Sequence, residues 1–354
     1  MLRILHLTDA YAAGVRIYID NLATSQHKAG HEVRVMALLR DDAKFDNPSE
    51  LPESQYTFLG TNSFTNLVKM TKRLIGIVEN YDYIHLHSSR MGAIGRIVAL
   101  KYPKKTFLYT PHGYAFLRKD VSGWQRKLFR IIEASLSKVP NTYILCVGAR
   151  EFSEAESIQS ERIGILRALI EVPNKLVNFG RLSSSDKLRI AFMCRNTPAK
   201  DPEFFLKLVA ASKLRAEYVW IGATRDEFEI SLTPSEISFL GPLDHENALA
   251  ELAKCNVLVV TSLWEGLPLN VVEAQMMGLL VVIRDTIEIP ELIKDKLTGY
   301  TFSTIEQYSD ILHSILLNDD LNSEIVLEAS KNAMQLFSIE LNETAWISSY
   351  QKAT

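Results

Sequence analysis

Short apolar runs rich in Val, Ile, Leu and Phe alternate with longer segments of helical period along the first half of the chain. The apolar runs predict strands over 3–10, 31–39, 83–88, 106–112 and 142–148. Residues 19–30 have helical spacing and predict a helix that ends at Gly30, a residue type common at helix C-termini. Such alternation is typical of parallel sheets covered by helices.

The same pattern restarts in the second half of the chain. Apolar runs there predict strands over 188–194, 217–222, 237–243, 256–262 and 278–285. Residues 202–212 predict a helix between the first two of these strands. Each half has about the size of one doubly wound domain. We therefore predict an α/β fold of two doubly wound, Rossmann-like domains that face each other across a cleft, with ligands beyond the carboxyl ends of the strands.

The segment GRLSSSDK, residues 180–187, joins the two halves with three serines and no apolar period. We place the domain boundary there, with an N-terminal domain over 1–182 and a C-terminal domain over 183–337. The tail over 338–354 carries apolar residues at mixed helical spacing, among them Trp346 and Tyr350. These side chains need a surface, and we expect the tail to pack on the first domain.

Length and composition fit a soluble two-domain protein. The chain has 354 residues, 47% hydrophobic and 23% charged, and its formal net charge of -3 gives no support to nucleic-acid binding. Its three cysteines predict neither a disulfide framework nor a zinc site. No signal peptide is visible, and no run of about 18 apolar residues predicts a membrane span. We expect a cytoplasmic protein, with peripheral contact at the inner face of the membrane left open.

The segment SLWEGLPLNVVEAQMMG, residues 262–278, places Glu265 and Glu273 on either side of a Gly-Leu-Pro turn. Pro268 suits the first position of a helix, whose unpaired amides would attract phosphate. The two acids could accept hydrogen bonds from hydroxyls at either end of that phosphate site. A diphosphate with hydroxyl groups on both sides of it is the chemical pattern of a sugar nucleotide. Taken alone, a solvated loop acid and a helix-dipole partner explain the pair equally well.

Other strand ends carry weaker signals of the same kind. Arg195 and Lys200 follow the strand over 188–194 and could hold a diphosphate leaving group. His112 ends an apolar strand beside Gly113, where a structural role for the histidine is the more common explanation.

The first strand ends in a segment where a dinucleotide fingerprint would lie. Gly14 stands between that strand and the first helix, but AYAAGV does not match G-x-G-x-x-G, so a nicotinamide cofactor is not supported. Ser88 and Ser89 open a helix within HLHSSRMGAIGR, as an anion site or as caps.

Together, the order and placement of these motifs resemble the retaining glycosyltransferases of family 4, which have the GT-B fold. The resemblance covers essentially the whole chain and is closest to the enzymes of bacterial capsule, O-antigen and exopolysaccharide synthesis. The segments that carry it are EGLPLNVVE, MCRNTPAKDP, HSSRMGAIGR, TPHGYAF, IPELIKDKLTGYTF and FLGPLDHENALAELAKCNVLVVTSLWEGLPL.

The resemblance implies a role for each matched residue. Arg195 and Lys200 would hold the donor diphosphate, Glu265 the transferred sugar and Glu273 the ribose. His112 would lie near the reaction centre. Backbone groups would complete the donor site, with Gly14, Gly266, Leu267, Leu269 and Asn270 near sugar and phosphate and Gly222 and Leu240 near the base. Two positions depart from the family pattern, since Ala13 replaces a first-loop glycine and Cys194 replaces the glycine before Arg195.

The resemblance also implies the reaction. A hexose-type sugar would move from a UDP-, GDP- or dTDP-sugar to a glycan or a polyprenyl-diphosphate-linked saccharide, with retention, by a front-face reaction without a metal cofactor. The sequence holds no D-x-D triplet, the usual metal signature of the other major transferase fold. Two alternatives stay open, a sugar-nucleotide epimerase of the same shape and a non-catalytic nucleotide-sugar-binding subunit.

Two segments mix basic and apolar residues, 64–78 and 116–138. As amphipathic helices they could lie on an anionic membrane surface. A packed helix with a solvated basic face is the commoner explanation of such a pattern.

Overall fold

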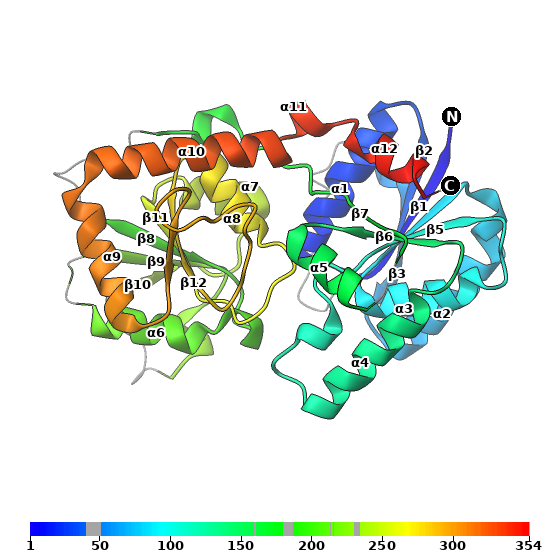
Figure 1. The fold of residues 1–354 in the computed structure, drawn as a ribbon, viewed down its shortest axis with the longest axis horizontal. Helices are drawn as coiled ribbons and strands as arrows, with labels where there is room; N and C mark the ends of the chain where they lie inside the picture. Colours follow the sequence, from blue (N-terminus) through cyan, green and yellow to red (C-terminus); the bar gives the residue numbers. More distant parts are fainter. Residues whose placement is uncertain are drawn as a thin grey trace. The chain divides into compact units, whose positions relative to one another are not determined.

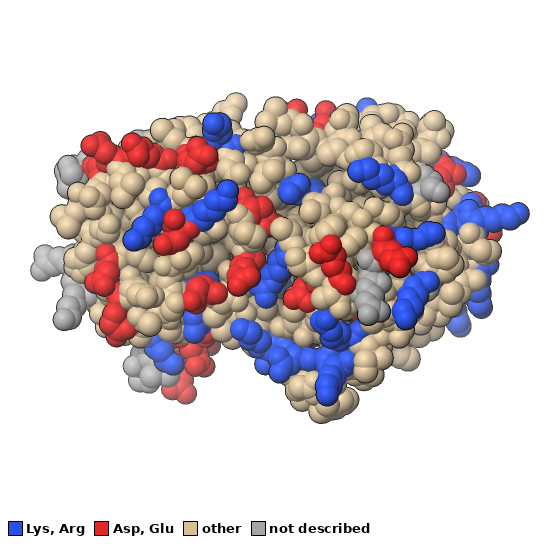
Figure 2. Space-filling model, in the orientation of Figure 1, with Lys and Arg blue, Asp and Glu red and all other residues tan. Residues whose placement is uncertain are grey.

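The computed structural model describes residues 1–39, 51–158, 161–179, 187–212, 214, 216–229 and 234–353. It divides into two compact units (Figure 1): Met1–Ile170 with Asn342–Thr354, and Glu171–Leu341. We call them unit 1 and unit 2. The domain boundary predicted at 182–183 lies outside the described residues. Both units are α/β and each contains one parallel sheet, as the strand pattern predicted. Acidic and basic side chains are interspersed over much of the face in Figure 2.

Unit 1 contains a seven-stranded sheet in the order β3-β2-β1-β4-β5-β6-β7. Its strands are β1 Arg3–Tyr11, β2 Glu32–Leu39, β3 Tyr56–Thr61, β4 Tyr83–His87, β5 Thr106–Thr110, β6 Thr142–Cys146 and β7 Ile163–Ile165. Its helices are α1 Ala13–Lys28, α2 Phe64–Ile77, α3 Ser89–Ala99, α4 Gly123–Leu136, α5 Ala149–Ser157 and, in the tail, α12 Ala345–Gln351. The order of strands reverses between β1 and β4, so the switch point of this sheet lies there.

Helix α1 corrects one sequence prediction. The helix expected over 19–30 begins six residues earlier, at Ala13, and ends at Lys28. The small residues of its first turn carry no apolar period, so the sequence pattern hides them. Gly30 follows the helix in the left-handed region, with φ +85°, as expected of a residue at a helix C-terminus.

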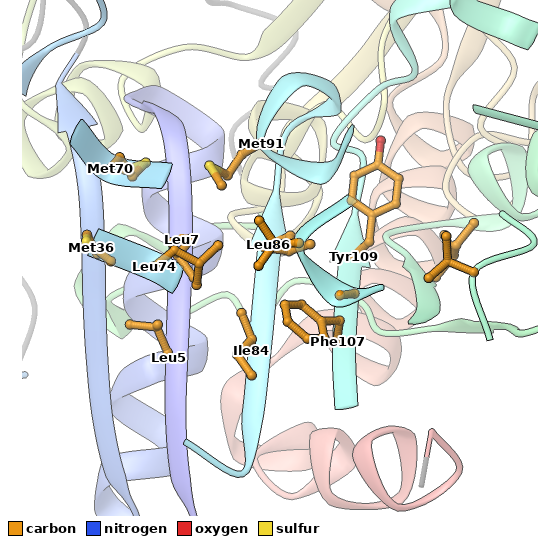
Figure 3. Packing of buried hydrophobic residues seen from close by; sticks show 14 of the residues in the cluster. Leu5, Leu7, Met36, Met70, Leu74, Ile84, Leu86, Met91, Phe107 and Tyr109 are labelled. Atoms are coloured by element: carbon orange, nitrogen blue, oxygen red, sulfur yellow. The ribbon is translucent and has the colours of Figure 1, made fainter. Parts of the chain in front are cut away.

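The two faces of the unit 1 sheet differ in chemistry because side chains alternate along each strand. One face is apolar and packs against α2 and α3 (Figure 3), with Leu5, Leu7, Ile84, Leu86, Phe107, Tyr109, Met70, Leu74 and Met91 in the core cluster. The residues between them, His6, His85, His87 and Thr110, are also fully buried, on the opposite face. This polar face is unusual for a buried sheet and requires hydrogen-bond partners.

The tail of the chain packs on unit 1. Trp346 and Tyr350 of α12 are buried, and the Tyr350 hydroxyl lies 2.8 Å from Nδ1 of His85. The Ser25 hydroxyl of α1 donates to the Glu343 carbonyl at 2.7 Å. The last residues of the chain therefore complete a unit built mainly from its first 170.

Unit 2 contains a six-stranded sheet in the order β10-β9-β8-β11-β12-β13. Its strands are β8 Arg189–Met193, β9 Glu217–Ile221, β10 Ile237–Phe239, β11 Val257–Val260, β12 Leu280–Arg284 and β13 Tyr300–Phe302. Its helices are α6 Pro202–Ala211, α7 His245–Leu252, α8 Leu269–Met276, α9 Ile305–Leu317 and α10 Asp319–Phe337, and α11 Ile339–Asn342 leads back to unit 1. The switch point lies between β8 and β11.

Short 3-10 helices complete the described secondary structure. They are Glu53–Gln55, Val78–Asn80, Ala115–Leu117, Asn174–Leu176, Pro198–Lys200 and Arg225–Glu227. Across the described ranges, no helix has the length and apolar character needed to cross a bilayer.

Gly222 allows two strand ends of unit 2 to approach closely. It follows β9 with φ +111°, and a Cβ placed there would lie 2.6 Å from the carbonyl oxygen of Cys194. That carbonyl also accepts a hydrogen bond from Nε1 of Trp220 at 3.0 Å. Both the backbone angle and the contact therefore require glycine.

We expect Gly222→Ala to lower the free energy of unfolding of unit 2 by about 2 kcal/mol or more, because the strain and the clash add. Gly241→Ala is the matched control in the same unit. Gly241 also has a positive φ, +69°, but its Cβ would meet only the Thr224 side chain, at 3.3 Å. In urea unfolding, Gly222→Ala should have a clearly lower free energy of unfolding than Gly241→Ala. An equal loss of free energy in both variants would contradict the contact between Gly222 and Cys194.

Candidate active site

An ion pair stands at the carboxyl ends of β8 and β11 in unit 2. The Lys200 ammonium contacts Oε1 of Glu265 in a short hydrogen bond, and the two side chains are 24% and 14% exposed. Their loops are tied together, since the Thr261 hydroxyl donates to the Lys200 carbonyl and Leu263 N–H donates to the Ala199 carbonyl, both at 2.7 Å. Two residues that are 65 positions apart in sequence thus form one rigid pair.

The charges of this pair support each other. Burial acts to lower the pKa of Lys200, but the Glu265 carboxylate and the nearby Cys194 act to raise it, and the pKa is raised overall. Burial raises the pKa of the neighbouring Cys194 thiol to about 12, so this residue stays neutral. Lys200 is therefore a fixed cation that an incoming anion can share with Glu265. Arg195 lies on the same loop and is partly exposed.

Asp201 supports the position of Lys200. It adopts a left-handed backbone, φ +48°, and its Oδ1 accepts from Phe204 N–H to cap α6. Its Oδ2 accepts from Arg284 at 2.6 Å, and that guanidinium lies over the Phe204 ring, 3.9 Å from its centroid. Neither Asp201 nor Arg284 was predicted as a site residue. Arg284 comes from β12, far along the chain from the segment that carries Lys200.

The start of α8 is open to an anion. No side chain caps this helix, whose N-cap residue is Pro268 with φ -76° and ψ 100°. The prediction that Pro268 is the first helical residue is wrong by one position, because its extended ψ leaves Leu269 to begin the helix. Gly266, Leu267 and Leu269 are partly exposed, and their amides belong to the segment where helix starts attract anions.

The Asn270 side chain has a structural role that the sequence did not predict. Its Nδ2 donates to the Met193 carbonyl at 2.9 Å and so ties the first turn of α8 to the end of β8. The helix start is thereby fixed beside the loop that carries Lys200.

Glu273 is paired inside unit 2. Its side chain is buried, and its Oε1 lies 2.7 Å from Nε2 of His245, the first residue of α7. His245 follows the N-cap Asp244, which accepts from Asn247 N–H at 2.8 Å. His245 was not among the residues predicted from the sequence, and its place at the start of a capped helix in LDHENALAEL was the available signal. A hydroxyl that binds Glu273 would meet His245 as well.

Backbone groups near Gly222 and Leu240 are partly engaged already. Gly222 N–H donates to the Gly241 carbonyl at 2.9 Å, and Leu240 N–H donates to the Trp220 carbonyl at 3.0 Å. A nucleotide base that binds here must therefore form hydrogen bonds with the carbonyl groups of these residues or with neighbouring amides.

The remaining two predicted residues, Gly14 and His112, belong to unit 1. The sequence predicted that Gly14 lies in a loop between the first strand and the first helix. Instead, Gly14 is the second residue of α1. The left-handed residue at this junction is Ala13, with φ +47°. Ser88 and Ser89 were predicted to form an anion site or caps. Ser88 caps α3, since its hydroxyl accepts from Met91 N–H, whereas the Ser89 hydroxyl accepts from Ala115 N–H after β5.

His112 lies after β5 in a strained turn. It has φ +55° and is followed by Gly113 with φ +95°. The buried Glu151 holds this turn, because its carboxylate accepts from Gly113 N–H and from Val147 N–H. A non-glycine residue in such a conformation costs on the order of 1–3 kcal/mol and is frequent at functional sites.

A chain of hydrogen bonds leads from His112 into the polar face of the sheet. Nε2 of His112 lies 3.0 Å from Nδ1 of His87, whose Nε2 lies 3.0 Å from Nδ1 of His6. Nε2 of His6 lies 2.8 Å from Oε1 of Gln26 on α1. His85 stands beside the chain and bonds instead to Tyr350 and Thr110, each at 2.8 Å.

Burial keeps these four histidines neutral. It lowers the pKa of His6 to about 4, and it lowers the pKa values of His112, His85 and His87 as well. For His85 and His87, the neighbouring imidazoles add to this effect.

The chain matches two known families. Residues 12–149 match Glycosyltransferase Family 4, and residues 187–318 match Glycosyl transferases group 1. A Klebsiella pneumoniae protein described as an uncharacterized 41.2 kDa protein in the cps region is 24% identical over 321 residues, which are 84% of this chain and 85% of that protein. The Escherichia coli UDP-Gal:alpha-D-GlcNAc-diphosphoundecaprenol alpha-1,3-galactosyltransferase is 25% identical over 306 residues, 75% of each chain.

Solved structures share the fold over the whole chain. Sucrose-phosphate synthase from Thermosynechococcus elongatus superposes with a TM-score of 0.82 at 16% identity, over 99% of both chains. Anabaena HepE in complex with UDP and glucose superposes with a TM-score of 0.79 at 14% identity, over 100% of both chains. At these identities the likeness shows the fold, which is the GT-B arrangement of two Rossmann-like halves.

We expect unit 1 to lose stability in mild acid. The four buried histidines have folded pKa values below the unfolded value of about 6.5, so their contribution is complete above that pH and is lost as the pH falls toward the folded values. Each would remove about 1.4 kcal/mol per pH unit within this window. Urea unfolding at pH 7.5 and 5.5 measures the loss. The exposed His313→Gln variant should follow the wild-type curve, and equal stability of the wild type at both pH values would contradict the prediction.

Proposed function

The chain belongs to the family 4 glycosyltransferases, and from this we propose that it moves a hexose-type sugar from a nucleoside diphosphate sugar to a lipid-diphosphate-linked saccharide, with retention of configuration. The observation that carries the proposal is the Lys200–Glu265 pair at the switch point of β8 and β11, beside the uncapped start of α8. A cation, an open helix start and a buried acid at Glu273 are the groups that a diphosphate and a ribose require.

The leaving diphosphate is stabilised by charge alone in this proposal. Lys200, Arg195 and the amides at the start of α8 take up the negative charge that develops on the phosphate oxygens. Glu265, released from part of its bond to Lys200, accepts hydrogen bonds from hydroxyls of the transferred sugar. No metal cofactor takes part in this step.

The reaction at the anomeric carbon follows a front-face course. The bond from the anomeric carbon to the phosphate oxygen breaks, and the bond to the acceptor oxygen forms on the same face of the sugar. The departing phosphate oxygen takes the proton of the acceptor hydroxyl, so no separate base is needed. Glu265 orients the sugar and balances positive charge at its ring, while the neutral His112 of unit 1 offers a hydrogen bond to substrate without adding charge.

Two relatives support the substrate class. The Escherichia coli relative takes UDP-Gal and a diphosphoundecaprenol-linked GlcNAc by its description, and HepE was solved with UDP and glucose. We therefore propose a UDP-sugar as donor and a saccharide on a polyprenyl diphosphate as acceptor, in the synthesis of a surface polysaccharide.

We expect Glu265→Gln and Lys200→Met each to lower kcat/KM for transfer by about 10²–10³, because each removes a charge that acts in the transition state. Sugar transfer is measured by release of nucleoside diphosphate with and without a prenyl-diphosphate-linked saccharide, in the presence and absence of EDTA. Turnover should require the acceptor and should survive EDTA.

The control is Lys254→Ala, which breaks the exposed Lys254–Glu251 pair on α7 and should leave transfer unchanged. Conversion of the donor without acceptor would identify an epimerase. Donor binding without any turnover would identify a binding subunit. Either result would refute the proposed reaction.

Helix α4 supports a place for the enzyme at the membrane surface. Trp124, Leu128 and Ile131 form an exposed apolar stripe at helical spacing, with Trp124 68% and Ile131 62% exposed. The exposed Arg126 and Lys127 flank this stripe. Figure 2 shows basic side chains gathered near the start of α4 and the loop before it. We propose that α4 lies at the surface of an anionic bilayer, where the lipid-linked acceptor resides.

Sedimentation with vesicles that contain an anionic lipid tests this contact. Ile131→Glu should abolish most of the binding, because it places a charge in the apolar stripe. Leu317→Glu introduces the same charge on α9, at a residue that is 81% exposed, and should bind as the wild type does. Equal binding by both variants, or none by the wild type at low salt, would contradict the proposal.

A further inference from the structure

Gln26 gives the buried histidine chain a direction. Its Oε1, which contacts Nε2 of His6, can only accept a hydrogen bond. A neutral imidazole has one N–H, so His6 must carry its hydrogen on Nε2 and must accept at Nδ1. The same bond then requires His87 to donate from Nε2, since these two atoms lie 3.0 Å apart.

The same reasoning fixes the donors along the row of hydrogen-bonded histidines as far as His112. His87 has used its single N–H on His6, so its Nδ1 accepts from Nε2 of His112. His112 must therefore carry its hydrogen on Nε2, which leaves Nδ1 as the nitrogen with a lone pair. One carbonyl oxygen on α1 thus specifies the tautomer of a residue that follows β5.

The opposite orientation of the Gln26 amide would reverse every donor in the chain. In the structure, Oε1 of Gln26, and not its Nε2, lies beside Nε2 of His6. The buried Nε2 of Gln26 has no hydrogen-bond partner among the described residues. The nitrogen of His112 that carries the hydrogen therefore reports which way this amide lies.

Packing holds the rings in this arrangement. The rings of His6 and His87 lie side by side with 22° between their planes, those of His87 and His112 with 25°, and Tyr18 meets His112 edge-on with centroids 4.8 Å apart. Ring rotation that exchanged donor and acceptor would need the whole row to move. The neutral state follows from the burial of the chain, so a proton is not available to make any ring a donor at both nitrogens.

A metal ion is the competing explanation for this cluster, because nitrogens of His6, His85 and His87 lie within 4.8 Å of one another. The hydrogen bonds argue against it. Nδ1 of His6 and Nε2 of His87 lie 3.0 Å apart and point their lone pair and hydrogen at each other. His85 has its own partners at both nitrogens, Tyr350 and Thr110. Zinc would have to displace these partners to be bound at about 2.0 Å.

We propose that Gln26, His6 and His87 are positioning residues that hold His112 as its Nε2–H tautomer, so that its Nδ1 serves as a hydrogen-bond acceptor for a hydroxyl of the substrate. The role of His112 toward the substrate rests on the proposed function. The tautomer itself does not. An acceptor nitrogen on a neutral ring suits a reaction that builds positive charge on the sugar, because an imidazolium there would oppose that charge.

The tautomer can be read directly by NMR of the full-length protein labelled with nitrogen-15 histidine at pH 7.5, with the His112 signals identified from their loss in His112→Gln. We expect Nε2 of His112 to be protonated and Nδ1 unprotonated. A protonated Nδ1, alone or with Nε2, would overturn the proposal.

Two substitutions of Gln26 test its control of the tautomer. Gln26→Glu keeps an acceptor oxygen and should keep His112 as Nε2–H. Gln26→Leu removes the acceptor, and a buried N–H without a partner costs more than an unused lone pair. The chain should then reverse, and His112 should become Nδ1–H. An unchanged tautomer in Gln26→Leu would overturn the proposal, as would a changed one in Gln26→Glu.

Thr110→Val is the matched control. It deletes an equally buried hydrogen bond to the neighbouring His85 but leaves the chain of His6, His87 and His112 intact. It should not change the His112 tautomer, and a reversal there would overturn the proposal by showing that any damage to this face has the same effect. If Gln26→Leu does not fold, the wild-type spectrum and Gln26→Glu still decide the assignment.

Kinetics separate the tautomer from its use in the reaction. We expect Gln26→Leu to lower kcat by about tenfold to a hundredfold with little change in KM for the donor, and Gln26→Glu to keep most of the activity. A switched tautomer with unchanged transfer would overturn the role of His112 while the proposed function stands. A wild type that shows the tautomer but no transfer would refute the proposed function instead. Stoichiometric metal in the purified protein, lost in His6→Gln, would overturn the hydrogen-bonded chain.

Discussion

The ion pair between Lys200 and Glu265 is the interaction on which the site in unit 2 depends. Partly buried charges are costly unless they are paired, and removal of one partner leaves the other uncompensated. The parallel sheet brings these two together, because β8 and β11 are neighbours at the switch point and their carboxyl ends share one edge. The ties from Thr261 to Lys200 and from Leu263 to Ala199 then fix the loops, so the charges are in place before a ligand arrives.

Much of this arrangement could be predicted from the sequence because it is local to strand ends. The buried strands over 188–194 and 256–262 were visible as apolar runs, and the residues after them were identifiable by type and spacing. What the sequence could not supply was the partner of each of these side chains. Asp201 needs Arg284, and Glu273 needs His245, and both partners come from elements whose position depends on the order of strands in the sheet.

Unit 1 shows a second limit of sequence reasoning. The alternation in RILHLT and YIHLHS predicts strands, but a strand with polar alternate residues is usually expected to expose them. Here α1 and α12 cover that face, so the histidines are buried. The start of α1 at Ala13 and the three-residue strands β7 and β13 were missed for a related reason, since small or few residues leave no apolar period to detect. The six-residue strand β3, YTFLGT, was missed because threonine and glycine interrupt its apolar residues.

The two units handle charge in opposite ways. Unit 2 keeps a cation at full charge by pairing it with a carboxylate, which suits a ligand that brings negative charge and can take over part of the pairing. Unit 1 buries its ionisable rings so completely that they stay neutral, and it orders them by hydrogen bonds instead. A neutral ring with a fixed lone pair can orient a hydroxyl without adding charge. The strained turn at His112, held by Glu151, is therefore best understood as the means by which this hydrogen-bonded order reaches the edge of the sheet.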